Sequence, residues 1–272
     1  MKDEEIGTRA RGEFIRVRTR QMLHHIFSVL KDEKQYLLPL KEVKPLIKPD
    51  KKVYKGIKSV EISRIVGSEG RYAEFNRMFL PRHKGLRSRW INLYQAFVKN
   101  EAVPPVKLYE LGGVYFVLDG NHRVSVARAL GLEYFEAEVI LLDYGIDLKP
   151  EISAEELKKA VINLENQEFF KKTGLDKSRP EAEIEFTSTG RYHELISHIH
   201  SHIEYIGTYK NKNLSFQEGA VSWYDNVFRP VVENIRRENF SSCFPGRSAA
   251  DFYVWCVRHC HDLDESAIHL SE

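Results

Sequence analysis

The spacing of apolar residues changes sharply near the middle of the chain. A continuous apolar run at residues 114–118 ends at an Asp-Gly turn, and beyond it apolar residues recur at helical spacing. That helical stripe consists of Val124, Ala127 and Leu130. The pattern therefore predicts a strand, a tight turn and a helix. Gly131 is expected just past the helix end, because glycine tolerates the left-handed backbone that closes a helix.

The spacing of apolar residues also predicts strands and helices in the rest of the chain. Strands are predicted at residues 59–62, 104–110, 114–118, 136–141 and 183–186, with a Gly-Gly hairpin turn at 112–113 and a loop at 37–40. Helices are predicted at residues 1–34, 42–47, 75–79, 91–98, 121–130, 155 onward, 192–206, 216–237 and 248–261. The long helix over 216–237 is expected to bend near Pro230. Strands mixed with helices, followed by helices alone, predict an α/β (α+β) fold.

Changes in composition divide the chain into four predicted segments. These are an N-terminal helical arm at 1–53, an α/β domain at 54–144, a charged linker at 145–188 and a helical C-terminal domain at 189–272. A boundary is placed near Gly145. Inside the linker, Ser153 and Glu156 have the spacing of a capping box, which predicts a helix start.

The net charge of the chain limits how it could bind nucleic acid. The 272 residues include 29% charged residues but carry a formal net charge of only +2, so any nucleic-acid contact must come from local patches. One patch is an Arg-rich helix at residues 9–20. The other is a basic loop whose expected contacts are Lys84, Arg87, Arg89 and the neighbouring Trp90. A solvated surface is the alternative interpretation of both patches, and both interpretations stay open.

The sequence also bears on compartment. It has 3 Cys residues, no secretory signal pattern at the start and no apolar run of the roughly 18 residues that a membrane span needs. We therefore expect a cytoplasmic protein with reduced thiols and no membrane partner.

The turn after the apolar strand carries the clearest candidate chemistry. Asn121, His122 and Arg123 occupy the first helical turn, where backbone N–H groups and the helix dipole favour an anion such as phosphate. Gly120 lets the backbone approach that anion closely. Cationic side chains in a first turn are unfavourable by about 0.3–1 kcal/mol, which suggests a bound partner that offsets the cost. An ordinary strand-turn-helix junction is the alternative interpretation.

The segment Tyr115–Gly131, YFVLDGNHRVSVARALG, resembles the second signature of the ParB/sulfiredoxin-like superfamily. The superfamily includes CTP-binding partitioning ParB proteins, free serine kinases, sulfiredoxins and nucleases, which handle nucleotides or phosphate esters at this turn. The resemblance covers about residues 54–143 and implies a domain with a small mixed sheet. The DGNHR form is closer to the serine kinases and nuclease-type members. Asn121 stands where sulfiredoxins carry their catalytic Cys, so sulfinic-acid reduction is not expected.

Residues 222–232 and 244–255 resemble the C-terminal region of an uncharacterised bacterial family that has a ParB-like domain upstream. This likeness implies an architecture and no activity. The Pro245-Gly246-Arg247 turn before the last helix is compatible with a second anion site, or with an ordinary helix start.

The resemblance also implies roles for individual residues. Glu69 is the expected general base, since the similar serine kinases use an acidic residue from the loop after the first strand, and His122 is the second catalytic candidate. Arg71 would be a further phosphate contact. Asp119 would hold Mg²⁺ or cap the helix. The implied function is binding of a nucleotide phosphate, with ATP, ADP or CTP as ligand, by a phosphotransferase or nucleotide hydrolase.

Two other functions stay open. The first is a DNA-binding regulator or ParB-like nuclease, although no helix-turn-helix follows the signature as it does in partitioning ParB. The second is a non-catalytic scaffold that senses a nucleotide. A homodimer is also left open.

Histidines and cysteines gather in the C-terminal domain, and each cluster has two interpretations. One set is His193, His198, His200 and His202, and the other is Cys256, His259, Cys260 and His261. The spacing of His198 and His202 on one helix face is compatible with a metal. Neither set has paired CxxC spacing, and a buried cysteine stripe is the alternative.

Overall fold

The computed structural model describes residues 3–30, 37–70, 73–238 and 246–268. The chain separates into two compact units, Met1–Leu157 and Lys158–Glu272. The first unit holds a six-stranded mixed sheet with helices, and the second is helical in its described residues. The α/β (α+β) fold class expected from the sequence is confirmed. The boundary between the units falls inside a helix, downstream of Gly145, and the four predicted segments stay a prediction.

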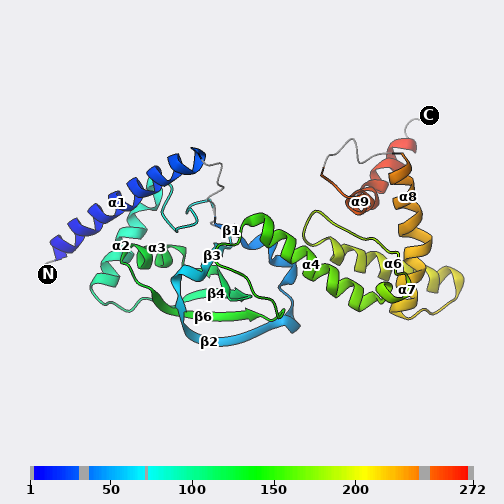
Figure 1. Cartoon of the computed structure of the whole chain (residues 1–272), viewed down its shortest axis with the longest axis horizontal. Coiled ribbons are helices and arrows are strands. Elements are labelled where there is room, and N and C mark those ends of the chain that lie inside the picture. Colours follow the sequence, from blue (N-terminus) through cyan, green and yellow to red (C-terminus); the bar gives the residue numbers. More distant parts are fainter. Residues whose placement is uncertain (1–2, 31–36, 71–72, 239–245, 269–272) are drawn as a thin grey trace. The chain divides into compact units, whose positions relative to one another are not determined.

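The sheet of the first unit has the order β1-β3-β5-β4-β6-β2. Its strands are β1 (Leu38–Pro39), β2 (Lys52–Glu61), β3 (Ile65–Ser68), β4 (Val106–Leu111), β5 (Val114–Asp119) and β6 (Tyr134–Leu142). β1, β3 and β5 run parallel to one another, β4 pairs β5 antiparallel and β6 parallel, and β2 pairs β6 antiparallel. The carboxyl ends of β1, β3 and β5 therefore meet at one edge of the sheet (Figure 1).

The centre of the sheet matches the sequence prediction. β5 covers the apolar run at 114–118, and Val114, Phe116 and Val117 are fully buried. Gly112 and Gly113 have positive φ angles of 58° and 83°, the conformation that a two-residue hairpin turn requires. Leu111 and Val114 pair across this turn. The predicted strand and hairpin are confirmed.

The outer strands differ from the prediction. β2 is ten residues long and forms an edge of the sheet, whereas only its last residues were predicted as a strand. Most β2 residues are exposed and include lysines, so the sequence lacks the apolar alternation that reports a half-buried strand. Leu38 and Pro39, predicted as loop, pair with β3. This short strand is specified by its pairing with β3, which is distant in sequence, so the neighbouring residues contain no pattern that predicts it.

Helix α3 (Asn121–Ala129) packs on the sheet, and α2 (Arg87–Val98) and α1 (Asp3–Leu30) pack beyond it (Figure 1). Val124 and Ala127 of α3 pack into the core of the sheet, whereas Val126 packs with residues of α1 and α2. Gly131 has φ +74°, and Leu132 N–H donates to Ala127 C=O at 3.0 Å, which closes the helix in a Schellman turn. The predicted helix and its glycine end are confirmed.

The second unit is a set of helices around an aromatic core. Its elements are α4 (Ala154–Thr173, which begins in the first unit), α5 (Leu175–Ser178), α6 (Arg191–Lys210), α7 (Phe216–Trp223), a π-helical segment η6 (Tyr224–Phe228), α8 (Arg229–Arg237) and α9 (Ala249–Ile268). Trp223, Phe228 and Tyr253 meet in the core. The run at 183–186, predicted as a strand, belongs to no sheet, because Ile184 and Phe186 pack into this helical core instead.

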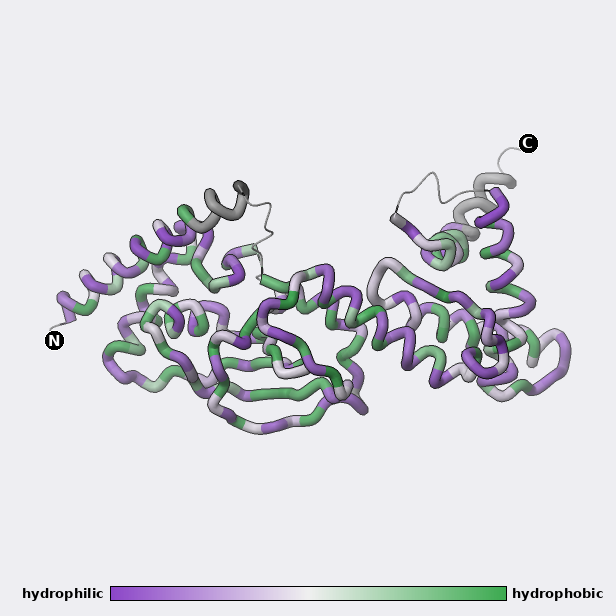
Figure 2. Tube along the Cα trace, viewed as in Figure 1, coloured by the Kyte–Doolittle hydropathy of each residue, from purple (hydrophilic) through white to green (hydrophobic). Residues whose placement is uncertain are grey.

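The capping box predicted at the start of α4 is confirmed. Ser153 and Glu156 form the reciprocal bonds of a capping box at 2.8 and 3.1 Å. The helix predicted over 216–237 changes to a π-helical turn just before Pro230, which has no N–H to donate. Figure 2 shows hydrophobic and hydrophilic residues alternating along α1 and α4, as expected of helices covered on one side.

No helix in the described ranges combines the length and the apolar composition that crossing a bilayer requires.

Candidate phosphate site at the start of α3

The predicted site residues gather where parallel strands end. β3 ends at Ser68 and the neighbouring β5 ends at Asp119. Beyond β3, Glu69 N–H donates to Val117 C=O at 2.8 Å, which places Glu69 beside β5. The structure therefore brings Glu69 and the turn at 119–123 to one edge of the sheet. Ligands of α/β sheets bind at such carboxyl edges.

The backbone at the start of α3 depends on Gly120. This residue has φ 116° and ψ 21°, and α3 has no side-chain cap there. A Cβ on Gly120 would lie 2.9 Å from Val106 Cγ2 and 3.1 Å from Arg123 Cζ. Gly120 C=O accepts the first intrahelical bond, from Val124 N–H at 3.0 Å. The N–H groups of Asn121 and Arg123 consequently have no acceptor inside the helix.

The polar side chains of the first turn are buried. Asn121, His122 and Arg123 expose only 7%, 5% and 9% of their surface. The His122 ring meets Phe75 edge-on at a centroid distance of 5.3 Å. Asn121 Oδ1 is buried and has no hydrogen-bond partner among the residues that the structure describes. A 180° rotation of the amide would place the Nδ2 donors where Oδ1 now lies. Asn121 can therefore form a hydrogen bond with either a donor or an acceptor of a ligand.

Arg123 is turned onto the protein itself. Its Nη1 donates to the carbonyl oxygens of Pro104 and Pro105 at 2.6 and 2.7 Å, and its Nη2 donates to Asp119 Oδ2. Three of its five N–H groups are therefore occupied, which leaves two for a ligand. The guanidinium braces the segment before β4 against the turn, and its role as a phosphate contact stays a prediction.

Asp119 keeps one carboxylate oxygen for a ligand. Its other oxygen pairs with Arg123, and 61% of its side-chain surface is exposed. Within the described ranges, no group of three or more His, Cys, Asp or Glu residues could hold a metal ion. Mg²⁺ is commonly held by one or two carboxylates together with substrate phosphates, so a single carboxylate fits only a metal that arrives with a nucleotide. Arg71 lies outside the described residues.

The basic loop differs from its sequence interpretation in one residue. Lys84, Arg87 and Arg89 are exposed, as nucleic-acid contacts would have to be. Trp90 is fully buried, donates from Nε1 to Ser125 Oγ at 3.0 Å and stacks on Tyr94. The prediction that Trp90 contacts nucleic acid is wrong in this structure, because the ring is a core residue. Its spacing from Tyr94, four residues along α2, was a signal for that burial.

Arg128 is a positioning residue that the sequence did not reveal. Its guanidinium donates to the carbonyl oxygens of Ile62 and Ile65 at 2.8 and 3.0 Å and lies 5.1 Å from the ring centroid of Phe79. Burial lowers the pKa of Arg128 to about 10. These bonds tie the C-terminal part of α3 to the chain segment that enters β3, at the opposite end of that strand from Glu69.

The histidine cluster of α6 is partly built into the core. His198 meets Tyr253 edge-on at 5.6 Å, and His202 Nε2 lies 3.0 Å from Ser222 Oγ. Burial lowers the pKa of both histidines. Cys256 is half-buried. Cys243 and the side chains of Cys260 and His261 lie outside the described residues.

Comparisons with protein-family models, with curated proteins and with solved structures find no match for this chain. The likeness to the ParB/sulfiredoxin-like superfamily thus rests on the motif at residues 115–131.

Proposed function

We propose that the chain is a cytoplasmic, ParB-like protein that binds a nucleotide phosphate at the turn 119–123 and transfers or hydrolyses its phosphoryl group. One observation carries this proposal. The start of α3 has no side-chain cap from Gly120, is buried, and lies at the carboxyl edge of β3 and β5 beside Glu69. A helix start of this kind favours negatively charged oxygens.

Each residue of the turn has a distinct expected task. The N–H groups at the start of α3 and the amide of Asn121 would hold phosphate oxygens, and Gly120 lets the backbone come close. Arg123 keeps the turn in place and offers its remaining N–H groups. Glu69 would orient or deprotonate the attacking oxygen, and His122 would pass a proton. Bound Mg²⁺ would neutralise phosphate charge next to Asp119.

A second function is favoured by a separate observation. Exposed arginines lie along α1 and in the first turn of α2, at Arg9, Arg11, Arg16, Arg20, Arg87 and Arg89. They could follow a DNA backbone in a regulator or nuclease. Affinity for DNA would then fall steeply with salt, by a slope of about 0.9 per phosphate contacted. Weak binding with little dependence on salt would count against DNA.

The experiment that tests the main proposal is a thermal-shift titration with ATP, ADP, CTP and GTP, each with and without Mg²⁺. A ligand at a hundred times its dissociation constant should add about 2.7 kcal/mol to the free energy of unfolding. Release of phosphate from the bound nucleotide is then followed. Binding without turnover would indicate the non-catalytic, nucleotide-sensing scaffold instead.

Three variants assign the roles. Asn121→Ala should weaken nucleotide binding and His122→Ala should reduce turnover, while Glu69→Gln should abolish turnover and leave binding in place. Glu136→Gln, which removes an exposed carboxylate from β6 of the same sheet, is the matched control and should change neither. Equal nucleotide affinity and turnover in all four variants would refute the proposal.

A further inference from the structure

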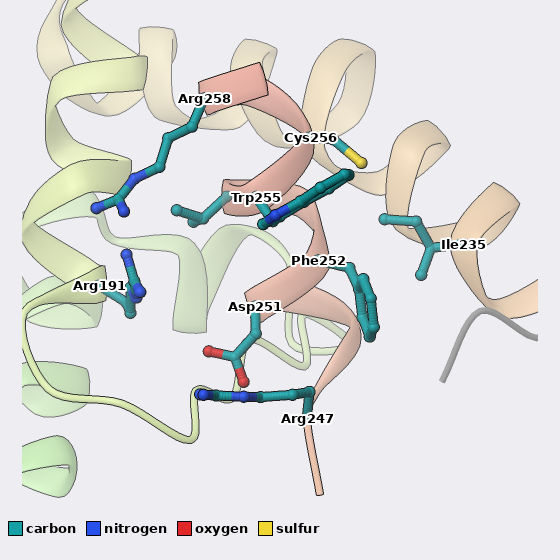
Figure 3. Close-up of a pocket in the computed structure, with 9 residues that line it drawn as sticks. Arg191, Ile235, Arg247, Asp251, Phe252, Trp255, Cys256 and Arg258 are labelled. Atoms are coloured by element: carbon teal, nitrogen blue, oxygen red, sulfur yellow. The ribbon is translucent and has the colours of Figure 1, made fainter. Parts of the chain in front are cut away.

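The second unit contains a cavity of about 410 Å³ beside the first turns of α9 (Figure 3). Ligand pockets in proteins commonly span about 300–1,000 Å³. Its lining residues are Arg191, Ile235, Arg247, Asp251, Phe252, Val254, Trp255, Cys256 and Arg258. Three of these residues are arginines, so the groups that pair with each guanidinium determine the net charge of the cavity.

Two of these arginines share one carboxylate. Glu194 Oε1 accepts from Arg191 Nη1 at 2.8 Å and from Arg258 Nη2 at 2.7 Å, and Glu194 Oε2 accepts from Arg258 Nε at 2.9 Å. This carboxylate fixes the direction of both guanidinium groups. It neutralises only one of their two charges.

The third arginine is held by neutral groups. Arg247 Nη1 donates to Thr187 Oγ1 at 3.1 Å and to Ser188 Oγ at 2.8 Å. These hydroxyls orient the guanidinium without neutralising it. Counting Glu194 and Asp251, three positive charges face two negative ones, so the site keeps a surplus of one positive charge.

Asp251 supplies an unsatisfied acceptor in the same place. Its Oδ2 accepts bonds from the N–H and hydroxyl groups of Thr187 and Ser248. Its Oδ1 is buried and has no hydrogen-bond partner within the described part of the chain. Figure 3 shows the carboxylate of Asp251 between Arg191 and Arg247. A ligand with a hydroxyl or N–H donor next to its anionic group would satisfy this oxygen.

The rest of the cavity is apolar and aromatic. Figure 3 shows Phe252 and Ile235 on the side away from Arg191. Trp255 lies between the two sides and exposes 55% of its surface, whereas Trp90 and Trp223 are fully buried. An exposed indole beside guanidinium groups offers a flat face on which a planar molecule can stack.

We propose that this cavity binds a small organic anion, a phosphate or carboxylate carried on a flat apolar body. The arginines hold the anionic group, Asp251 Oδ1 accepts from a neighbouring donor of the ligand, and Trp255 and Phe252 cover the flat body. The site stands on the second unit alone and does not depend on the function proposed for the turn at 119–123.

Trp255 provides the measurement. It is the one exposed tryptophan of the 3 in the chain, so a ligand that stacks on it should change the intrinsic fluorescence. The full chain is titrated with phenyl phosphate, benzoate, inorganic phosphate and benzyl alcohol. We expect saturable quenching by phenyl phosphate or benzoate, and at least about tenfold weaker binding of the two fragments, since each lacks one half of the recognised chemistry. Whichever of phenyl phosphate and benzoate binds more tightly identifies the anionic group.

The variants Arg247→Gln and Arg258→Gln should each weaken that binding by about tenfold or more. Arg237→Gln is the matched control, since it removes an exposed positive charge from α8 of the same unit and should leave binding unchanged. Arg258→Gln also breaks the pair with Glu194, so the melting temperature of each variant is measured. Arg247→Gln breaks bonds to hydroxyls only and keeps the test valid if Arg258→Gln unfolds.

Three results would overturn the proposal. The first is the absence of saturable quenching by either aromatic anion. The second is equal binding of inorganic phosphate or of benzyl alcohol, which would remove the need for the combined chemistry. The third is equal weakening by Arg237→Gln, which would show a general effect of charge. Asn121→Ala should leave this fluorescence titration unchanged, so its outcome is separable from that of the nucleotide experiment.

Discussion

Helices α3 and α6 begin in the same way and differ in what meets their first turn. Each starts after a glycine with positive φ, 116° at Gly120 and 84° at Gly190, and neither glycine can supply a side-chain cap. At α6 the protein supplies an anion itself, because both carboxylate oxygens of the buried Glu165 accept from Gly190 N–H at 2.9 and 2.8 Å. At α3 the first turn carries a histidine and an arginine instead.

The two helices have the same backbone conformation at their start, but only in α6 does a carboxylate of the protein bind there. A helix start attracts negative charge, and in α6 Glu165 already provides it. In α3 the nearest acidic residue in sequence, Asp119, pairs with the guanidinium of Arg123. Other helices of the chain, such as α7, use a capping box and expose it. In the proposed function, the start of α3 is the place where an anion from outside the protein binds.

The largest effect should come from Gly120→Ala. The added Cβ would meet Val106 Cγ2 at 2.9 Å in a backbone conformation that L residues rarely adopt. We expect the free energy of unfolding to fall by about 3 kcal/mol and the nucleotide-dependent shift in melting temperature to disappear. Both are read from thermal and denaturant unfolding.

The control for that variant is Gly131→Ala at the other end of α3. Gly131 also has positive φ, but a Cβ there would meet no atom within 4 Å. Its cost should be about 1 kcal/mol, with the nucleotide shift retained. A loss of the nucleotide shift in Gly131→Ala as well would show that the effect of Gly120→Ala is general destabilisation.

Glu165→Gln tests the role of the carboxylate at the start of α6. Removing the charge from a buried carboxylate that serves the start of α6 should lower the free energy of unfolding by about 2 kcal/mol. Glu204→Gln, an exposed position on α6, should change it by less than about 0.5 kcal/mol. If the two variants are equally stable, Glu165 does not act as an internal anion and the contrast with α3 fails.

Ser215→Ala should have a smaller effect. Ser215 Oγ accepts from Glu218 N–H at 3.3 Å, and Glu218 Oε2 accepts from Ser215 N–H at 2.9 Å, so α7 is capped by its own residues. Loss of this cap should cost about 1 kcal/mol in urea unfolding. The nucleotide-dependent shift should be the same as in the wild type, since the start of α7 is not the proposed nucleotide site.

Local features of the fold could be predicted because the residues that specify them are adjacent. The Gly112-Gly113 hairpin, the Gly131 helix end and the Ser153 capping box each depend on a few neighbouring residues. Residues 37–40 and β2 could not be predicted in the same way. Their pairing is decided by distant strands, and most of β2 is exposed and charged.

In the candidate site, too, features set by adjacent residues could be predicted and features set by distant residues could not. Its residues at 119–123 were found because an apolar strand runs directly into a polar helix start. The direction of Arg123 was not predictable, because its acceptors at Pro104 and Pro105 lie on another part of the chain. Arg128 shows the same limit, since a buried guanidinium bound to carbonyl groups has no partner pattern in the sequence.

The smallest expected effect is a dependence on pH from His198 in the second unit. Burial lowers the pKa of His198 in the folded protein, with Glu194 raising it and Arg258 lowering it further. The unfolded chain therefore binds a proton at higher pH than the folded one, so stability is full above about pH 6.5 and falls as the pH drops through the folded pKa. His198→Phe should reduce the loss of stability between pH 7.5 and pH 5, measured by urea unfolding. His193→Phe replaces an exposed histidine of the same helix and should leave the pH dependence as it is. An unchanged pH dependence in His198→Phe would show that the buried ring does not gain its proton on unfolding.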